Sequence, residues 1–138
     1  MKILVYLNFK MNEESLYLES VELLKELIST QSFSFHEENT ATLLENWLNK
    51  NSIPFKRHVN NIYCYNKYYD EEKPNILLNS HHDTVEPNDS YTNDPYEPIV
   101  DQGKLYGLGS NDAGASLVSL LSTFKFFYNC KNLNYNLI

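Results

Sequence analysis

Apolar residues in the first third of the chain recur with the period of an α-helix. Between residues 13 and 29 the spacing is four, three and four, through Tyr17, Val21, Leu24 and Ile28. A second stripe follows the segment "SFSFHEE" and is made of Leu43, Leu44, Trp47 and Leu48. Apolar side chains at such spacings lie on one face of a helix. The pattern therefore predicts two amphipathic helices that bury these faces.

Both ends of the second helix carry local signals. Ser34 is followed three residues later by Glu37, which predicts a capping box in which the two side chains satisfy free backbone N–H groups. Pro54 cannot continue a helix and pushes Ile53 toward extended geometry, so the helix should end near Ser52.

Shorter apolar runs predict strands. Three of them span residues 55–59, 61–65 and 75–78, and the final letters "NYNLI" begin another. Residues 76–78 are apolar at consecutive positions, as in an interior strand that helices cover on both faces.

The region between the third strand and the last helix is rich in residues that break regular structure. Residues 86–103 contain three prolines and Gly103, and they predict an ordered loop. A last helix should run from about Ala113 to Tyr128, with small residues 114–116 that let backbone or a ligand approach closely. Helices alternating with strands predict an α/β layer fold with a mostly parallel or mixed sheet, in one domain of residues 1–138.

Composition and charge exclude several classes of protein. Eleven basic residues stand against eighteen acidic ones, for a net charge of -7, and no basic cluster could bind a run of phosphates. Nucleic acid is therefore not an expected partner. Cys64 and Cys130 form no metal-binding pair and no disulfide framework, which favours a reduced, cytoplasmic protein. The first ten residues lack the features of a secretory signal, and no apolar run is long enough for a membrane span.

The chemistry-bearing residues begin at the end of the third strand, in "NILLNSHHDTVEP". Residues i and i+2 of an extended chain point to the same side, so His81 and Asp83 share a face and His82 points away. Imidazole is a good zinc ligand, and a nearby carboxylate can accept its second N–H and fix its tautomer. The ends of strands in α/β sheets are also where ligands bind. The alternative is a solvated polar turn without chemistry.

A second candidate segment is "LYGLGSNDAGAS", residues 105–116. Asp112 lies between a glycine-bearing loop and the start of the last helix. A carboxylate there is favoured by the helix dipole and can bind a cation or bridge two metal ions about 3.5–4 Å apart. The alternative is a simple helix N-cap.

Together the two segments resemble the N-terminal part of the M20-like metallopeptidase family, which includes acetylornithine deacetylase, succinyl-diaminopimelate desuccinylase and aminoacylase. The stretch "LLNSHHDTVEPNDSYTNDPYEPIVDQGKLYGLGSNDAGASLVSLL" is most similar to the acetylornithine deacetylase branch. The resemblance implies the N-terminal part of a three-layer αβα catalytic domain. It implies that His81 binds one metal, that Asp83 is the catalytic residue orienting it, and that Asp112 bridges two Zn²⁺ ions, with Co²⁺ as an alternative. It also implies a cis peptide bond between Asp112 and Ala113.

One departure from the family pattern is large. In the family a Glu-Glu pair, a further acidic ligand and a late histidine complete the site, and a smaller domain covers it and often forms a homodimer. This chain has no Asp, Glu or His after Asp112. His36, Glu37, Glu38 and His58 match no family motif position, so we do not expect them to replace the missing groups.

The resemblance implies hydrolysis of N-acetylornithine to ornithine and acetate, in arginine biosynthesis, with this chain as an N-terminal fragment. Related desuccinylase or dipeptidase specificity is the nearest enzymatic alternative. A different class of function is a catalytically inert truncated or split-gene product that needs a second polypeptide to supply the other ligands. A metal-independent binding module is a further alternative, in which His81 and Asp112 could be replaced without loss of a ligand.

Overall fold

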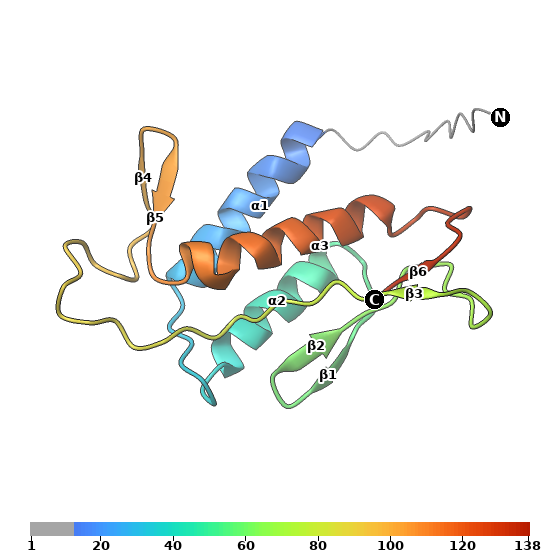
Figure 1. Cartoon of the computed structure of the whole chain (residues 1–138), viewed down its shortest axis with the longest axis horizontal. Helices are drawn as coiled ribbons and strands as arrows, with labels where there is room; N and C mark the ends of the chain where they lie inside the picture. Colours follow the sequence, from blue (N-terminus) through green and yellow to red (C-terminus); the bar gives the residue numbers. More distant parts are fainter. Residues whose placement is uncertain (1–12) are drawn as a thin grey trace.

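The computed structural model describes residues 13–138, so the expectation for a signal in the first ten residues lies outside the described part. Three helices lie beside three two-stranded sheets (Figure 1). The α-helices are α1 (Glu13–Ile28), α2 (Glu38–Lys50) and α3 (Ser116–Phe127), and the π-helical segment η1 (Ser110–Ala115) directly precedes α3. The strands are β1 (Lys56–His58), β2 (Asn61–Tyr63), β3 (Asn75–Ile76), β4 (Ile99–Asp101), β5 (Lys104–Tyr106) and β6 (Asn136–Leu137).

The two stripes predicted from the sequence form the centre of the core. Buried apolar residues come from all three helices and from the last strand: Leu23, Leu24, Ile28, Trp47, Leu48, Val118, Phe124 and Leu137. Tyr17, at the start of the first stripe, is 67% exposed. The N-terminal end of α1 projects beyond the other two helices (Figure 1), and among the described residues Leu18 beside Tyr17 is also exposed.

The predicted capping box is wrong. The residue before α2 is Glu37, and no side chain caps the helix. The Ser34 hydroxyl donates to the carboxylate of Asp83, 49 residues further along the chain. The Glu37 carboxylate accepts from the backbone N–H of Phe35 and from the side-chain amide of Asn60. Ser34 has therefore a tertiary partner in place of the helix N–H, and Glu37 has one local and one tertiary partner.

The sheets are mixed, in agreement with the predicted α/β class, and the strands are shorter than expected. β1 and β2 form an antiparallel hairpin, while β3 and β6 pair in parallel, so "NYNLI" does contain a strand. Ile76 is 42% exposed and Leu77 67% exposed, so the expected cover on both faces of β3 is not observed. Within the described residues β3 pairs with β6 alone, and its other edge has no partner strand.

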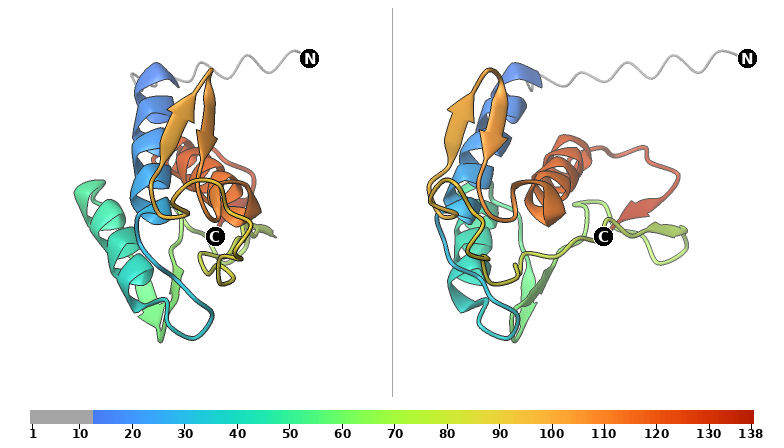
Figure 2. Two further views of the ribbon diagram at one scale, coloured as in Figure 1. Left: turned by 90° about the vertical axis from the view of Figure 1, so that its left-hand side faces the viewer. Right: turned by 60° about the vertical axis from the view of Figure 1, so that its left-hand side comes forward.

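The region predicted as loop contains an additional hairpin. β4 and β5 pair in antiparallel register around Gln102 and Gly103, which both have positive φ. Such a two-residue turn matches the twist of a hairpin, and Gly103 was its sequence signal rather than a sign of irregular structure. Figure 2 shows this hairpin standing apart from the other two sheets. Residues 86–98 are irregular, as expected. Among residues 13–138, no helix combines the length and apolar character needed to cross a bilayer.

Candidate metal centre

The segment after β3 places its two histidines on opposite sides of the chain, as the alternation of an extended backbone predicts. The His81 ring contacts Asp83, with Nδ1 3.0 Å from Oδ1 and 3.2 Å from the backbone oxygen. The His82 ring instead contacts Thr40 and the backbone oxygen of Asn60. The proposed pairing of His81 with Asp83 is therefore a direct contact in the structure.

Asp112 reaches the same imidazole from the other side, across 31 residues of sequence. Its Oδ1 lies 3.1 Å from Nε2 of His81, and its side chain is 88% exposed. Asp112 has non-helical backbone angles, and no side chain caps α3, so it is not the simple N-cap that was the alternative. The Asp112–Ala113 peptide bond is cis, as the family resemblance implied.

The loop that carries Asp112 packs closely on α1 through glycines. A Cβ on Gly107, whose φ is +152°, would lie 2.3 Å from the Cγ2 atom of Ile28. A Cβ on Gly114 would lie 2.6 Å from a methyl group of Leu24. The small residues at the start of the last helix thus let backbone approach the core, and this contact fixes the loop against a rigid helix.

Hydrogen bonds shift the pKa values of Asp83 and His81 in opposite directions. The pKa of Asp83 lies below its ordinary value because the Ser34 hydroxyl donates to it at 2.5 Å; partial burial opposes this, and His81 adds to the lowering. Burial alone would lower the pKa of His81, but its hydrogen bonds with Asp112 and Asp83 raise it overall. Both ring nitrogens of His81 therefore face a carboxylate oxygen, Nδ1 that of Asp83 and Nε2 that of Asp112.

This geometry requires a positive species between His81 and Asp112. Each ring nitrogen of His81 faces a carboxylate oxygen, but a neutral imidazole carries only one N–H, so one of these contacts would bring two lone pairs together. Either a second proton or a cation must lie between them. Two ligands of a tetrahedral zinc ion stand about 3.3 Å apart, since each bond is about 2.0–2.1 Å. The observed 3.1 Å is the length of a hydrogen bond to a protonated imidazole and is also close to the separation of two ligands of one metal ion.

His81 and Asp112 alone supply fewer ligands than a zinc site normally has. Among residues 13–138, no group of three or more His, Cys, Asp or Glu side chains is arranged to hold a metal ion. Asp83 is occupied with Nδ1 of His81 and Ser34. The carboxylate of Glu37 accepts hydrogen bonds from the backbone N–H of Phe35 and the side chain of Asn60.

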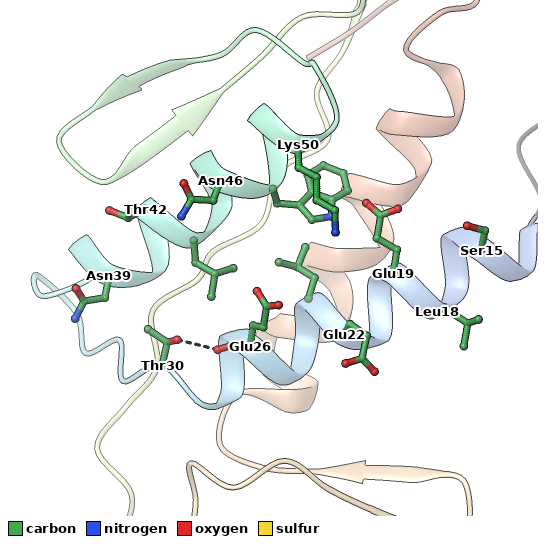
Figure 3. A pocket seen from close by; sticks show the side chains of 13 residues that line it. Ser15, Leu18, Glu19, Glu22, Glu26, Thr30, Asn39, Thr42, Asn46 and Lys50 are labelled. Carbon is green, nitrogen blue, oxygen red and sulfur yellow. Dashed lines mark hydrogen bonds between the residues drawn. The ribbon is translucent and has the colours of Figure 1, made fainter.

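A cavity of about 340 Å³ lies beside these side chains. It is lined by His81, Asp83, Tyr91 and Asp112 together with residues 107–111 and 84–85. A larger groove of about 740 Å³ lies between α1 and α2, bordered by Glu19, Glu22, Glu26 and Lys50 (Figure 3). None of the three candidate site residues lines the larger groove, so its size does not make it the reactive site.

A known protein family matches the part of the chain that carries the candidate site. The family described as "Peptidase family M20/M25/M40" matches residues 77–136, which include His81, Asp83 and Asp112. The comparisons support the M20 peptidase family. They do not support the acetylornithine deacetylase branch that the sequence motifs suggested, because several relatives carry another name.

Two relatives are succinyl-diaminopimelate desuccinylases. The one from a Nitratiruptor species is 26% identical over 110 residues, which are 78% of this chain and 30% of the relative. The one from a Sulfurovum species is 24% identical over 107 residues, 76% of this chain and 29% of the relative. An uncharacterized metallohydrolase from Methanocaldococcus jannaschii is 37% identical over 74 residues, 44% of this chain and 18% of the relative. The chain thus spans less than a third of the length of the curated relatives it matches.

Two residues of the site were not identified as such from the sequence. Ser34 was assigned to a helix cap, and His82 was noted only as pointing away from His81. Neither role has a local signal, because both partners lie far away along the chain: Asp83 for Ser34, and Thr40 for His82.

Proposed function

We propose that this chain is the N-terminal part of a metal-dependent M20 hydrolase of the desuccinylase type, which cleaves the amide of a small N-acylated amino acid. His81 and Asp112 would hold the metal, Zn²⁺ or alternatively Co²⁺, and Asp83 would orient His81. The observation that carries this proposal is the 3.1 Å contact between Nε2 of His81 and a carboxylate oxygen of Asp112, with Nδ1 already committed to Asp83.

Each of these three side chains has a distinct task. Asp83 accepts from Nδ1–H, which leaves the Nε2 lone pair free for a cation. Asp112 offers two carboxylate oxygens from an exposed side chain, so it can bind one ion or bridge two. A bound divalent metal would activate water and stabilise negative charge on the amide oxygen. The cavity beside His81 and Asp112 would admit the acyl end of the substrate.

The general base and the other ligands belong, in this proposal, to a further stretch of polypeptide, either continuous with this chain or a separate partner. Support comes from the absence of a third convergent ligand among residues 13–138 and of any Asp, Glu or His after Asp112. By itself the chain would bind metal and would not hydrolyse substrate. A homodimer of the complete enzyme remains part of this proposal.

Zinc titration by calorimetry tests the metal site. His81→Ala and Asp112→Ala should each weaken Zn²⁺ binding at least tenfold, since even the loss of a ligand's supporting group costs about 10–100-fold. His58→Ala and Asp101→Ala are matched controls, because both residues are exposed in hairpins and should leave the affinity unchanged. Binding that is equally weak in all five proteins would contradict the proposal.

A chimera tests the reaction and the substrate. Replacing the aligned 110 residues of the Nitratiruptor relative by the matching part of this chain supplies the remaining polypeptide. The chimera should hydrolyse N-succinyl-diaminopimelate faster than N-acetylornithine and lose activity with Asp112→Ala. The opposite preference would favour the deacetylase branch. No hydrolysis of either, in a folded chimera that binds zinc, would favour the inert alternative.

A further inference from the structure

His82 lies between the candidate metal ligand His81 and its partner Asp83, yet it faces away from both. Its ring is half-buried, with Nε2 3.0 Å from the backbone oxygen of Asn60 and Nδ1 2.8 Å from the Thr40 hydroxyl. A carbonyl oxygen only accepts, so Nε2 must carry the proton. In the neutral ring Nδ1 is then the acceptor, and Thr40 donates to it.

The Thr40 hydroxyl is itself fully buried and held by a second buried hydroxyl. The Ser32 hydroxyl lies 2.7 Å from that of Thr40. Ser32 is 1% exposed and Thr40 is 0% exposed. The single proton of Thr40 has three acceptors within reach: the Ser32 hydroxyl at 2.7 Å, Nδ1 of His82 at 2.8 Å and the backbone oxygen of Glu37 at 3.0 Å. Because Nδ1 of neutral His82 can only accept, the Thr40 proton goes to it and Ser32 donates to Thr40, so a chain of donors runs from Ser32 through Thr40 and His82 to Asn60.

This chain of hydrogen bonds ties three segments to the loop of the site. Ser32 precedes α2, Thr40 lies in the first turn of α2, and Asn60 is in the turn between β1 and β2. The same loop is tied a second time, because the backbone N–H of Thr84 donates to the backbone oxygen of Ser32 at 2.6 Å. The backbone of His81 and Asp83 is therefore held from residues 82 and 84.

We propose that His82 is a positioning residue, which fixes the His81–Asp83 pair in the geometry that binds metal through the Ser32–Thr40–His82–Asn60 hydrogen bonds. This inference rests on the proposed metal site. Its physical basis is the cost of leaving buried hydroxyls unpaired, because Thr40 and Ser32 have no access to water that could replace the imidazole. His82 touches neither metal nor substrate in this proposal and acts through the backbone it shares with its neighbours.

The test compares His82→Leu with His82→Gln, using Co²⁺ as the probe. Leucine has the bulk of the ring without its nitrogens, whereas the glutamine amide can donate to Asn60 and accept from Thr40. We expect His82→Leu to weaken Co²⁺ binding about tenfold and to change the visible absorption spectrum of the bound ion. His82→Gln should restore much of both.

A destabilised control separates positioning from a general loss of stability. Ile53→Val removes one methylene group from a side chain that is 2% exposed, and it should lower stability without altering Co²⁺ affinity or spectrum. Equal affinity in His82→Leu and the unmodified chain, or a loss no larger than in Ile53→Val, would overturn the proposal.

A metal-free measurement keeps this test separate from that of the proposed function. The ¹⁵N signals of the His81 ring report its contacts with Asp83 and Asp112 directly. If the unmodified chain binds no Co²⁺, the proposed metal site fails, and the His82 inference is then judged by these signals alone. They should shift or broaden in His82→Leu and recover in His82→Gln. Unchanged His81 signals in both variants would overturn the inference whatever the result with metal.

Discussion

The helical core and the loops around His81 are ordered by different interactions. In the core, Leu24, Trp47 and Phe124 come from three helices and are each at least nine-tenths buried. At the candidate site, the side chains of His81 and Asp112 are 53% and 88% exposed, and hydrogen bonds define their positions. Burial of apolar surface gives stability without direction, whereas hydrogen bonds give direction with little net stability. Changes in the core should therefore cost folding free energy, and changes at the site should cost binding.

The largest effect on stability should come from the core. Phe124 is 3% exposed, so Phe124→Ala leaves a cavity among the helices and should lower the free energy of unfolding by about 3–5 kcal/mol. Urea denaturation measures it. Phe35→Ala is the control, because that ring is 89% exposed and its loss should change stability by less than about 0.5 kcal/mol. Similar losses in both variants would remove the contrast between packed and exposed regions.

A smaller and pH-dependent effect is expected where the three helices meet. Glu19 of α1 accepts hydrogen bonds from Lys125 of α3 and from Asn51, which follows α2. Burial alone would raise the pKa of Glu19, but these two partners lower it overall from its ordinary value of 4.5. Because the folded-state pKa is depressed, the stabilisation is fully present above about pH 4.5 and is lost as the pH falls through the folded-state pKa.

Glu19→Gln should accordingly lower stability by about 1–2 kcal/mol at neutral pH and flatten its decrease in acid. Urea denaturation in a series of buffers from neutral to about pH 3 checks both parts. Glu71→Gln, at an exposed turn, serves as the control and should leave the profile unchanged. A Glu19→Gln profile as steep as that of the unmodified chain would show that this carboxylate contributes nothing.

The smallest effect on stability should come from the site itself. Ser34 is exposed, and Ser34→Ala should change the free energy of unfolding by no more than about 0.5 kcal/mol. It removes the main cause of the lowered Asp83 pKa, so that pKa should rise toward its ordinary value of 3.8. An NMR titration of the Asp83 carboxyl measures this, with Ser15→Ala as the control. An unchanged Asp83 pKa would mean that Ser34 does not hold this carboxylate.

Several features followed from the sequence because their causes are local. The helical period of apolar residues located α1, α2 and most of α3, since each helix buries a continuous face of its own residues. The contact between His81 and Asp83 also has a local cause, because residues i and i+2 of an extended chain point to the same side. The resemblance to the acetylornithine deacetylase branch was not supported, because the two relatives from Nitratiruptor and Sulfurovum are named desuccinylases.

Other features were decided only by the tertiary structure. The hydroxyl of Ser34 could bond a helix N–H or a distant carboxylate, and only the approach of Asp83 across 49 residues determines which. His82 was recognisable as a residue facing away from the site, but its partners Thr40 and Asn60 come from elements that no local pattern brings together. A short polar side chain takes the partner that folding places within about 3 Å. Periodicity therefore located the elements, and contact in space assigned their polar side chains.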